Sequence, residues 1–180
     1  YRDSRLYPHS GFVTELQTDF AGLGGDAKFF RPAITGAYYI PLDAIFGNDQ
    51  WGVKVAATVG YLYEIGGKDL IIDRFFLGGD NLRGFQTGGA GPHDRVSGDP
   101  VGGRFMWTQT TELRFPLPVS ADLGLNGRAF VDVGALTNAS FRNISNCVEL
   151  NGAPCSITQS AAPRVGAGFG ISWRTQFGLI

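Results

Sequence analysis

The chain has 180 residues, a formal net charge of −1, 27 glycines and 13% aromatic residues, but only one methionine. Its near-zero charge gives no basis for binding nucleic acid or an acidic ligand, and its length fits one domain or less. Abundant glycine and aromatic residues favour strands and turns over helices. The absence of any run of about eighteen apolar residues excludes a transmembrane helix, whereas a spanning strand needs only about ten alternating residues.

Strands dominate the pattern along the chain. Residues 1–11 contain Pro8 and Gly11, and we expect a turn that leads into the first strand. Six stretches then alternate between apolar and polar residues with the period of two that indicates strands. They are residues 12–20, 28–42, 51–64, 105–115, 125–135 and 164–175. Pro32 lies inside the second stretch, where it predicts a bulge or an unpaired position.

The connections between these strands alternate in length. Those after the second and fourth strands are short, whereas residues 66–103 and 137–163 form two long loops. Short turns on one side and long loops on the other are typical of up-and-down membrane barrels. Aromatic residues near the short-turn ends fit an interfacial girdle: Tyr38, Tyr39, Trp51, Phe115 and Trp173. The sequence therefore predicts an all-β, antiparallel transmembrane β-barrel, here a partial barrel of about six strands. A soluble β-sandwich or β-barrel is the alternative.

Charged residues on the polar strand faces predict a site inside the barrel. A charge at the middle of a strand costs a few kcal/mol in lipid, so Glu112 and Asp132 are expected to face the lumen. The glycine-rich first loop also carries apolar residues around Arg83, which indicates that it folds inward and packs. Arginine binds carboxylates through two parallel hydrogen bonds, so we expect Arg83 to meet both acids. The alternative is an exposed Arg83, with Glu112 paired to Arg114 or Arg128.

Other chemistry finds little support in the sequence. Cys147 and Cys155 lie in one polar loop and predict a disulfide, with two free thiols as the alternative. No nearby His or third Cys completes a metal site. Of the two histidines, His9 lies at a turn entry and His93 in the long loop, and neither lies on a lumen or lipid face beside a serine, so we expect no enzyme activity. The run from Gly78 to Gly84 lacks the Lys-Ser/Thr of a phosphate loop, and no cofactor is expected.

Four motifs resemble the BamA family of outer-membrane insertases, in an α-proteobacterial style. They are DRFFLGGDNLRGF at residues 73–85, GP at 91–92, FVDVG at 130–134 and RVGAGFGISWRTQFG at 164–178. The resemblance implies that the six strands correspond to strands nine to fourteen of about sixteen, and that residues 66–103 are extracellular loop six. The family's Arg-Gly-Phe/Tyr motif falls on Arg83, Gly84 and Phe85. Its acidic partners in the lumen fall on Glu112 and Asp132.

The resemblance also implies a function. Such proteins fold and insert nascent outer-membrane proteins in the bacterial outer membrane, in contact with its lipid bilayer and with accessory assembly lipoproteins. Residues 1–180 are then expected to form one partial barrel domain without the family's periplasmic POTRA repeats, first barrel strand or last two strands. Alone, this piece is not expected to close a barrel. The alternatives are a TamA-like or two-partner secretion transporter barrel, which shares the loop motif, and a passive porin.

Overall fold

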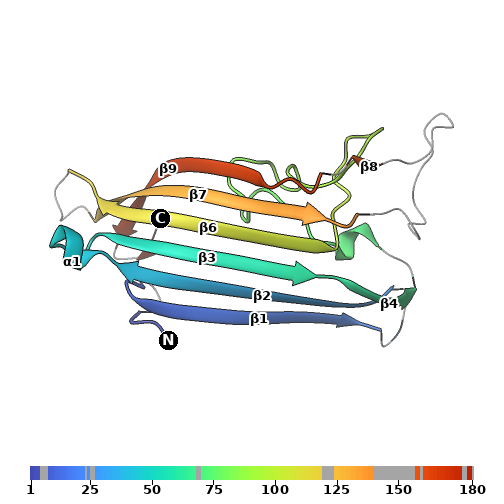
Figure 1. The fold of residues 1–180 in the computed structure, drawn as a ribbon, viewed down its shortest axis with the longest axis horizontal. Helices are drawn as coiled ribbons and strands as arrows, with labels where there is room; N and C mark the ends of the chain where they lie inside the picture. The colour runs from blue at the N-terminus through green and yellow to red at the C-terminus, as the bar shows by residue number, and fades with distance from the viewer. Residues whose placement is uncertain are drawn as a thin grey trace.

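One large antiparallel sheet forms the body of the molecule (Figure 1). The structure is a computed structural model that describes residues 1–4, 8–22, 24, 27–67, 70–118, 124–139, 157–158, 160–175 and 178–179. The sheet has eight strands in the order β1-β2-β3-β6-β7-β9-β10, and β4 (Tyr63–Gly67) pairs with the start of β2. The others are β1 (Gly11–Ala21), β2 (Ala27–Pro41), β3 (Gly52–Tyr61), β6 (Phe105–Pro116), β7 (Leu125–Thr137), β9 (Arg164–Thr175) and β10 (Gly178–Leu179).

Each long strand pairs antiparallel with the next long strand along the chain. This up-and-down order, with six long strands at the expected places, confirms the predicted fold class. Within the described residues β1 and β10 stand at opposite ends of the strand order, so the sheet is open, as in a partial barrel. No helix in the described part of the chain is long and apolar enough to cross a membrane.

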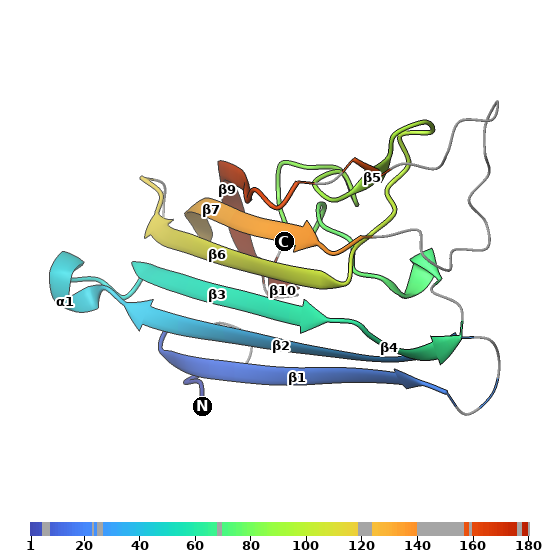
Figure 2. The ribbon, with the colours of Figure 1, turned by 45° about the vertical axis from the view of Figure 1, so that its right-hand side comes forward.

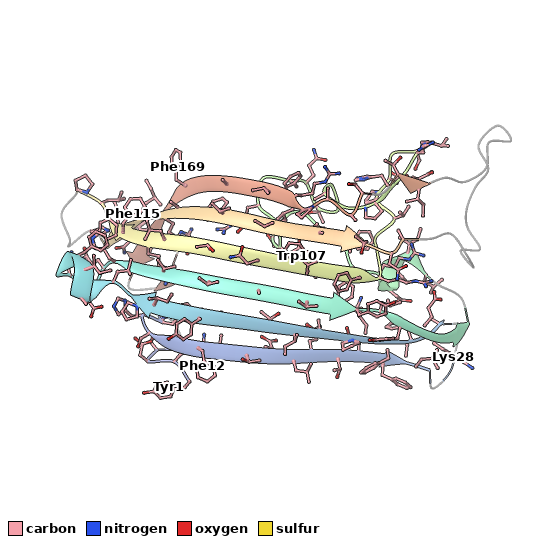
Figure 3. All side chains as sticks on the ribbon, in the orientation of Figure 1. Tyr1, Phe12, Lys28, Trp107, Phe115 and Phe169 are labelled. Carbon is pink, nitrogen blue, oxygen red and sulfur yellow. The ribbon has the colours of Figure 1, made fainter. Side chains whose placement is uncertain are left out.

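Apolar side chains cover one face of the sheet. Alternate residues of a strand point to opposite faces, and the exposed face carries the apolar series that the alternation predicted. Phe169 projects away from β9 and Phe12 away from β1 in Figure 3. This face is exposed at Phe12, Leu16, Phe20, Phe30, Ile34, Tyr38, Ile40, Val59, Val131, Val165, Phe169, Ile171 and Trp173. Large apolar surfaces of this kind mark contact with a membrane or another apolar partner.

The structure corrects four details. The third predicted strand breaks at Leu62, because this buried residue donates its N–H to the carbonyl of Arg104 instead of to a neighbouring strand. Of the two outcomes expected at Pro32, the bulge lies instead between Lys28 and Phe29, opposite β4, whereas the unpaired position is confirmed, because Pro32 has no partner in β3 or β4. Tyr39 is buried, unlike Tyr38, because adjacent strand residues face opposite ways. The short turn after β2 also contains an unexpected helical turn, α1 (Asp43–Phe46).

The long loop between β4 and β6 folds over the inner face of the sheet (Figure 2). It contains the short 3-10 helix η1 (Ile71–Asp73) and the strand β5 (His93–Asp94), which pairs with β8 (Ile157–Thr158). A buried apolar cluster joins the loop to β6 and β7: Leu77, Leu82, Ala90, Met106 and Leu136. The inward fold of this loop is therefore confirmed. Cys147 and Cys155 lie outside the described residues, and their disulfide stays a prediction.

Candidate functional site

Arg83 lies at the inner tip of the long loop and binds both predicted carboxylates. Its Nε donates to Oδ2 of Asp132 at 2.6 Å and its Nη2 to Oδ1 at 2.7 Å, a two-pronged pairing. Its Nη1 donates to Oε2 of Glu112 at 3.2 Å. The backbone N–H of Arg83 also donates to Asp132 at 3.2 Å. The alternative of a solvent-exposed Arg83 is wrong, and the predicted pairing with both acids is confirmed.

The two carboxylates come from neighbouring strands and share the inner face. Glu112 of β6 lies opposite Phe130 of β7, so Asp132 is its diagonal neighbour two residues further along β7. Diagonal neighbours on one face lie about 7–8 Å apart at the backbone, a separation that one guanidinium can bridge. The Asp132 side chain is 3% exposed and that of Glu112 is 8% exposed. Buried carboxylates without a partner are costly, so each depends on a cation.

A second arginine also binds Glu112. Arg114 lies two residues after Glu112 on β6, and its Nε donates to Oε1 of Glu112 at 3.3 Å. This pairing was part of the alternative interpretation, and the structure shows that it coexists with the Arg83 pairing. Glu112 thus binds two guanidinium groups, those of Arg83 and Arg114. Hydrogen bonding to Asp132 is the main reason that the pKa of Arg83 is raised above its usual value, so this loop arginine stays charged.

The wall beneath Arg83 is shaped to receive it. The guanidinium Cζ lies 3.5 Å from the centre of the Phe130 ring, which gives a cation–π contact. Gly166 of β9 lies directly against the loop, because a Cβ built there would come within 2.0 Å of the Arg83 carbonyl oxygen. Gly84 has a φ of +94°, a left-handed conformation that favours glycine.

The rest of the loop tip is held by its own turn. The side chain of Asn81 accepts from the Gly78 N–H at 2.9 Å and donates to the Phe76 carbonyl at 2.8 Å. Leu82 is fully buried next to Arg83, and Phe85 packs against the same apolar cluster. These contacts fix the direction in which Arg83 enters the lumen.

Sequence reasoning missed three contributors to this site. Phe130, Gly166 and Asn81 were not named as site residues. Phe130 interrupts the polar face of its strand, between Arg128 and Asp132, and this irregularity is the signal that could have identified it. The glycines on the polar face of residues 164–175 were a second signal, since glycine in a strand can mark the close approach of another backbone.

Neither histidine makes a contact with Arg83 or its two carboxylates among the described residues. Among the described residues, no group of three or more His, Cys, Asp or Glu side chains could hold a metal ion. His9 lies near the short turn after β2, with Nε2 4.0 Å from Asp43, and His93 lies in β5 of the loop. The contacts of Arg83 provide charge pairing and hold the loop backbone in position.

Comparison with known proteins identifies the family. The Omp85 superfamily domain matches residues 1–180. The outer membrane protein assembly factor BamA of Neorickettsia risticii is 28% identical over 180 residues, which is 99% of this chain and 22% of that protein. A SAM50-like protein of Drosophila melanogaster is 31% identical over 120 residues, 65% of this chain and 26% of that protein.

A solved structure gives the same fold. The crystal structure of BamA from Haemophilus ducreyi lacking POTRA domains 1–3 matches with a TM-score of 0.74 and 22% sequence identity. The match covers 99% of this chain and 35% of that one. The chain spans about a quarter or less of the length of the Neorickettsia risticii and Drosophila melanogaster relatives. Since the family match covers the whole sequence, this chain belongs to the Omp85 superfamily.

Proposed function

We propose that this chain is part of a machine that folds and inserts outer-membrane proteins. The Omp85 superfamily match and the BamA relatives support a location in the bacterial outer membrane. The relatives are named as assembly factors, which favours assembly over the transporter and porin alternatives. The exposed apolar face of the sheet is the surface that would contact the lipid bilayer.

The observation that carries this proposal is the clamp formed by Arg83, Asp132 and Glu112. It ties the loop tip to β6 and β7, and the loop in turn occupies the inner face of the sheet. A loop held in this way props the lumen and limits how far the wall can deform. The clamp thereby stabilises the barrel wall while a client protein is being inserted.

The remaining partners follow from the same proposal. Nascent outer-membrane proteins are the clients, and accessory assembly lipoproteins are the partners outside this segment. We assign residues 1–180 to one partial transmembrane barrel domain, with no enzymatic activity and no cofactor. The work of this segment is then mechanical and depends on binding and packing alone.

Insertion by the full-length protein in lipid vesicles tests the proposal. The measured quantity is the rate at which a denatured outer-membrane protein becomes folded and protected from protease. Arg83→Ala removes three side-chain hydrogen bonds from two buried carboxylates. We expect the insertion rate to fall about tenfold or more, since leaving a buried charge unpaired costs about 3–5 kcal/mol of stability.

Arg95→Ala is the matched control, because Arg95 is an exposed arginine of the same loop. It should insert client proteins at the rate of the unmodified protein. An Arg83→Ala protein that folds normally and inserts clients at full rate would refute the role given to the clamp.

A further inference from the structure

A second arginine reaches the long loop from another part of the sheet. Arg31 lies on the inner face of β2 and pairs directly with Asp19 of β1 in the strand register. Its Nε and Nη2 donate to Oδ2 of Asp19 at 3.0 and 2.8 Å. Its Nη1 donates to the carbonyl of Asp73 at 2.7 Å, across 42 residues of sequence. One guanidinium thus joins two strands and the beginning of the loop.

The same guanidinium also contacts the aromatic ring that seats the loop. Its Cζ lies 5.6 Å from the ring centre of Phe75 and 6.0 Å from that of Phe29. The Phe75 ring rests on Gly60 of β3, where an added Cβ would come within 2.6 Å of it. The backbone of Phe75 is paired with Gly103 by two hydrogen bonds of 3.0 Å, so the two ends of the loop meet here.

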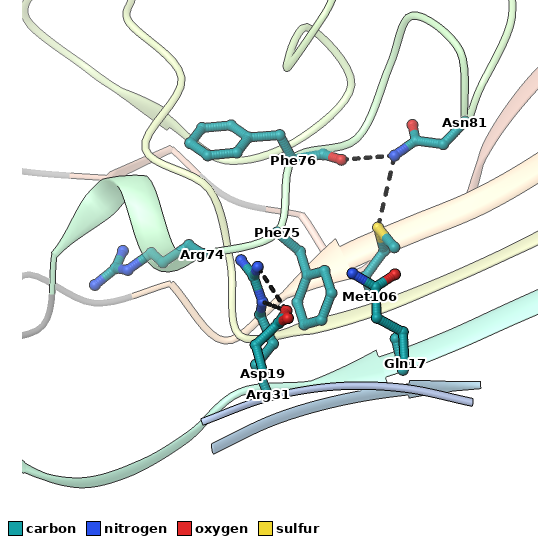
Figure 4. Close-up of a pocket in the computed structure, with 9 residues that line it drawn as sticks. Gln17, Asp19, Arg31, Arg74, Phe75, Phe76, Asn81 and Met106 are labelled. Atoms are coloured by element: carbon teal, nitrogen blue, oxygen red, sulfur yellow. Dashed lines mark hydrogen bonds and ion pairs between the residues drawn. The ribbon is translucent and has the colours of Figure 1, made fainter. Parts of the chain in front are cut away.

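Apolar packing does not fill this region. A cavity of about 240 Å³ lies between the wall and the loop, lined by residues that include Asp19, Arg31, Arg74 and Phe75 (Figure 4). The buried apolar cluster lies against β6 and β7 instead. Near β1 and β2, the Arg31 contacts therefore bridge a gap that side-chain packing leaves open.

From these contacts we propose that Arg31, oriented by Asp19, is a positioning residue that holds the root of the loop. The loop root is defined as residues 70–77 together with 101–104, and the loop tip as residues 78–91. Arg83 fixes the tip to β6 and β7, and Arg31 fixes the root to β1 and β2. Two arginines at different strands of the same wall then set the depth of the loop.

Hydrogen exchange of the full-length protein in lipid, resolved by peptide, tests this assignment. Root amides of Arg74, Phe75 and Gly103 and tip amides of Gly79 and Ala90 are all hydrogen-bonded, so exchange reports opening of each part. Arg31→Ala should raise exchange about tenfold or more in root peptides, because hydrogen bonds to charged groups are the stronger class. Exchange in tip peptides should change less.

Three further variants separate positioning from general stability. Lys54→Gln removes a cation from the same face of the sheet, opposite Glu112 and not Asp19, and should leave root exchange unchanged. The swap of Asp19→Arg with Arg31→Asp restores an ion pair between β1 and β2, but moves the guanidinium one strand away from the loop. It should not restore root protection. Arg31→Lys keeps the charge without the planar fork and should raise root exchange by a smaller factor; it is the variant to measure if Arg31→Ala fails to fold.

Unchanged root exchange in Arg31→Ala or, if that protein does not fold, in Arg31→Lys would overturn the assignment. Full recovery in the swapped protein would also overturn it, because the pair between strands would then suffice. Equal rises of hydrogen exchange in root and tip peptides would indicate general loosening of the structure and would overturn the assignment. An equal rise of root exchange in the Lys54→Gln protein would do the same. The role assigned to Arg31 depends on the proposed function only where it predicts an effect of Arg31 on client insertion. Faster root exchange with a normal insertion rate would leave Arg31 in place and refute the propping role of the loop.

Discussion

Replacing Gly166 with alanine probes the inward loop without changing any charge. An added Cβ would lie 2.0 Å from the Arg83 carbonyl oxygen, and real Cβ atoms essentially never approach closer than 3.0 Å. The loop or strand β9 must therefore move by about 1 Å or more. The obstacle is backbone, so no change of rotamer can relieve the clash.

Such a movement acts directly on the clamp. The Arg83 bonds to Asp132 measure 2.6 and 2.7 Å, and an outward shift of about 1 Å takes them beyond the usual 3.2 Å limit. Overpacking of this kind costs about 1–3 kcal/mol. We expect Gly166→Ala to lower the free energy of unfolding by this amount and to raise exchange at the loop tip.

The same strand offers a matched control. Gly170 also lies on β9, four residues away and on the same face, but an added Cβ there meets nothing within 4 Å. Gly170→Ala should be neutral or slightly stabilising, because alanine restricts the unfolded chain. Chemical denaturation of the full-length protein in lipid or detergent measures both variants. Equal stability and equal loop exchange in the two would refute the close packing of loop against wall.

Three other substitutions test separate parts of the structure. Phe169→Arg places a charge at an exposed position in the middle of β9 and should cost about 2–4 kcal/mol by denaturation in lipid. Leu77→Ala empties a fully buried position of the loop itself and should cost about 2–5 kcal/mol, with faster proteolysis of the loop. Phe130→Leu removes the ring beneath the Arg83 guanidinium and should cost about 1 kcal/mol, measured by thermal unfolding.

The sequence was sufficient to predict the strands and the central ion pairs. Alternation over ten or more residues determines which side of a strand faces inward, and this pattern alone predicts that Glu112 and Asp132 share one face. A charge in lipid is so costly that only the lumen remained for them. Arg83 then followed from its setting in a glycine-rich loop with apolar anchors.

Contacts between distant segments could not be predicted in the same way. The link from Arg31 to the Asp73 carbonyl depends on where a folded loop begins, and no local pattern records that position. The break at Leu62 arises because Arg104, far along the chain, accepts its hydrogen bond. Local alternation determines faces, whereas tertiary contacts determine where a strand stops.

The central claim is that Arg83 and Asp132 act as a unit to hold the loop inside the lumen. A double-mutant cycle measures this most directly, with Arg83→Ala, Asp132→Ala and the double variant compared by unfolding free energy and by loop exchange in the full-length protein. Because the two side chains form a two-pronged ion pair, we predict that the double variant loses less than the sum of the single losses. Independent, additive losses would contradict the claim.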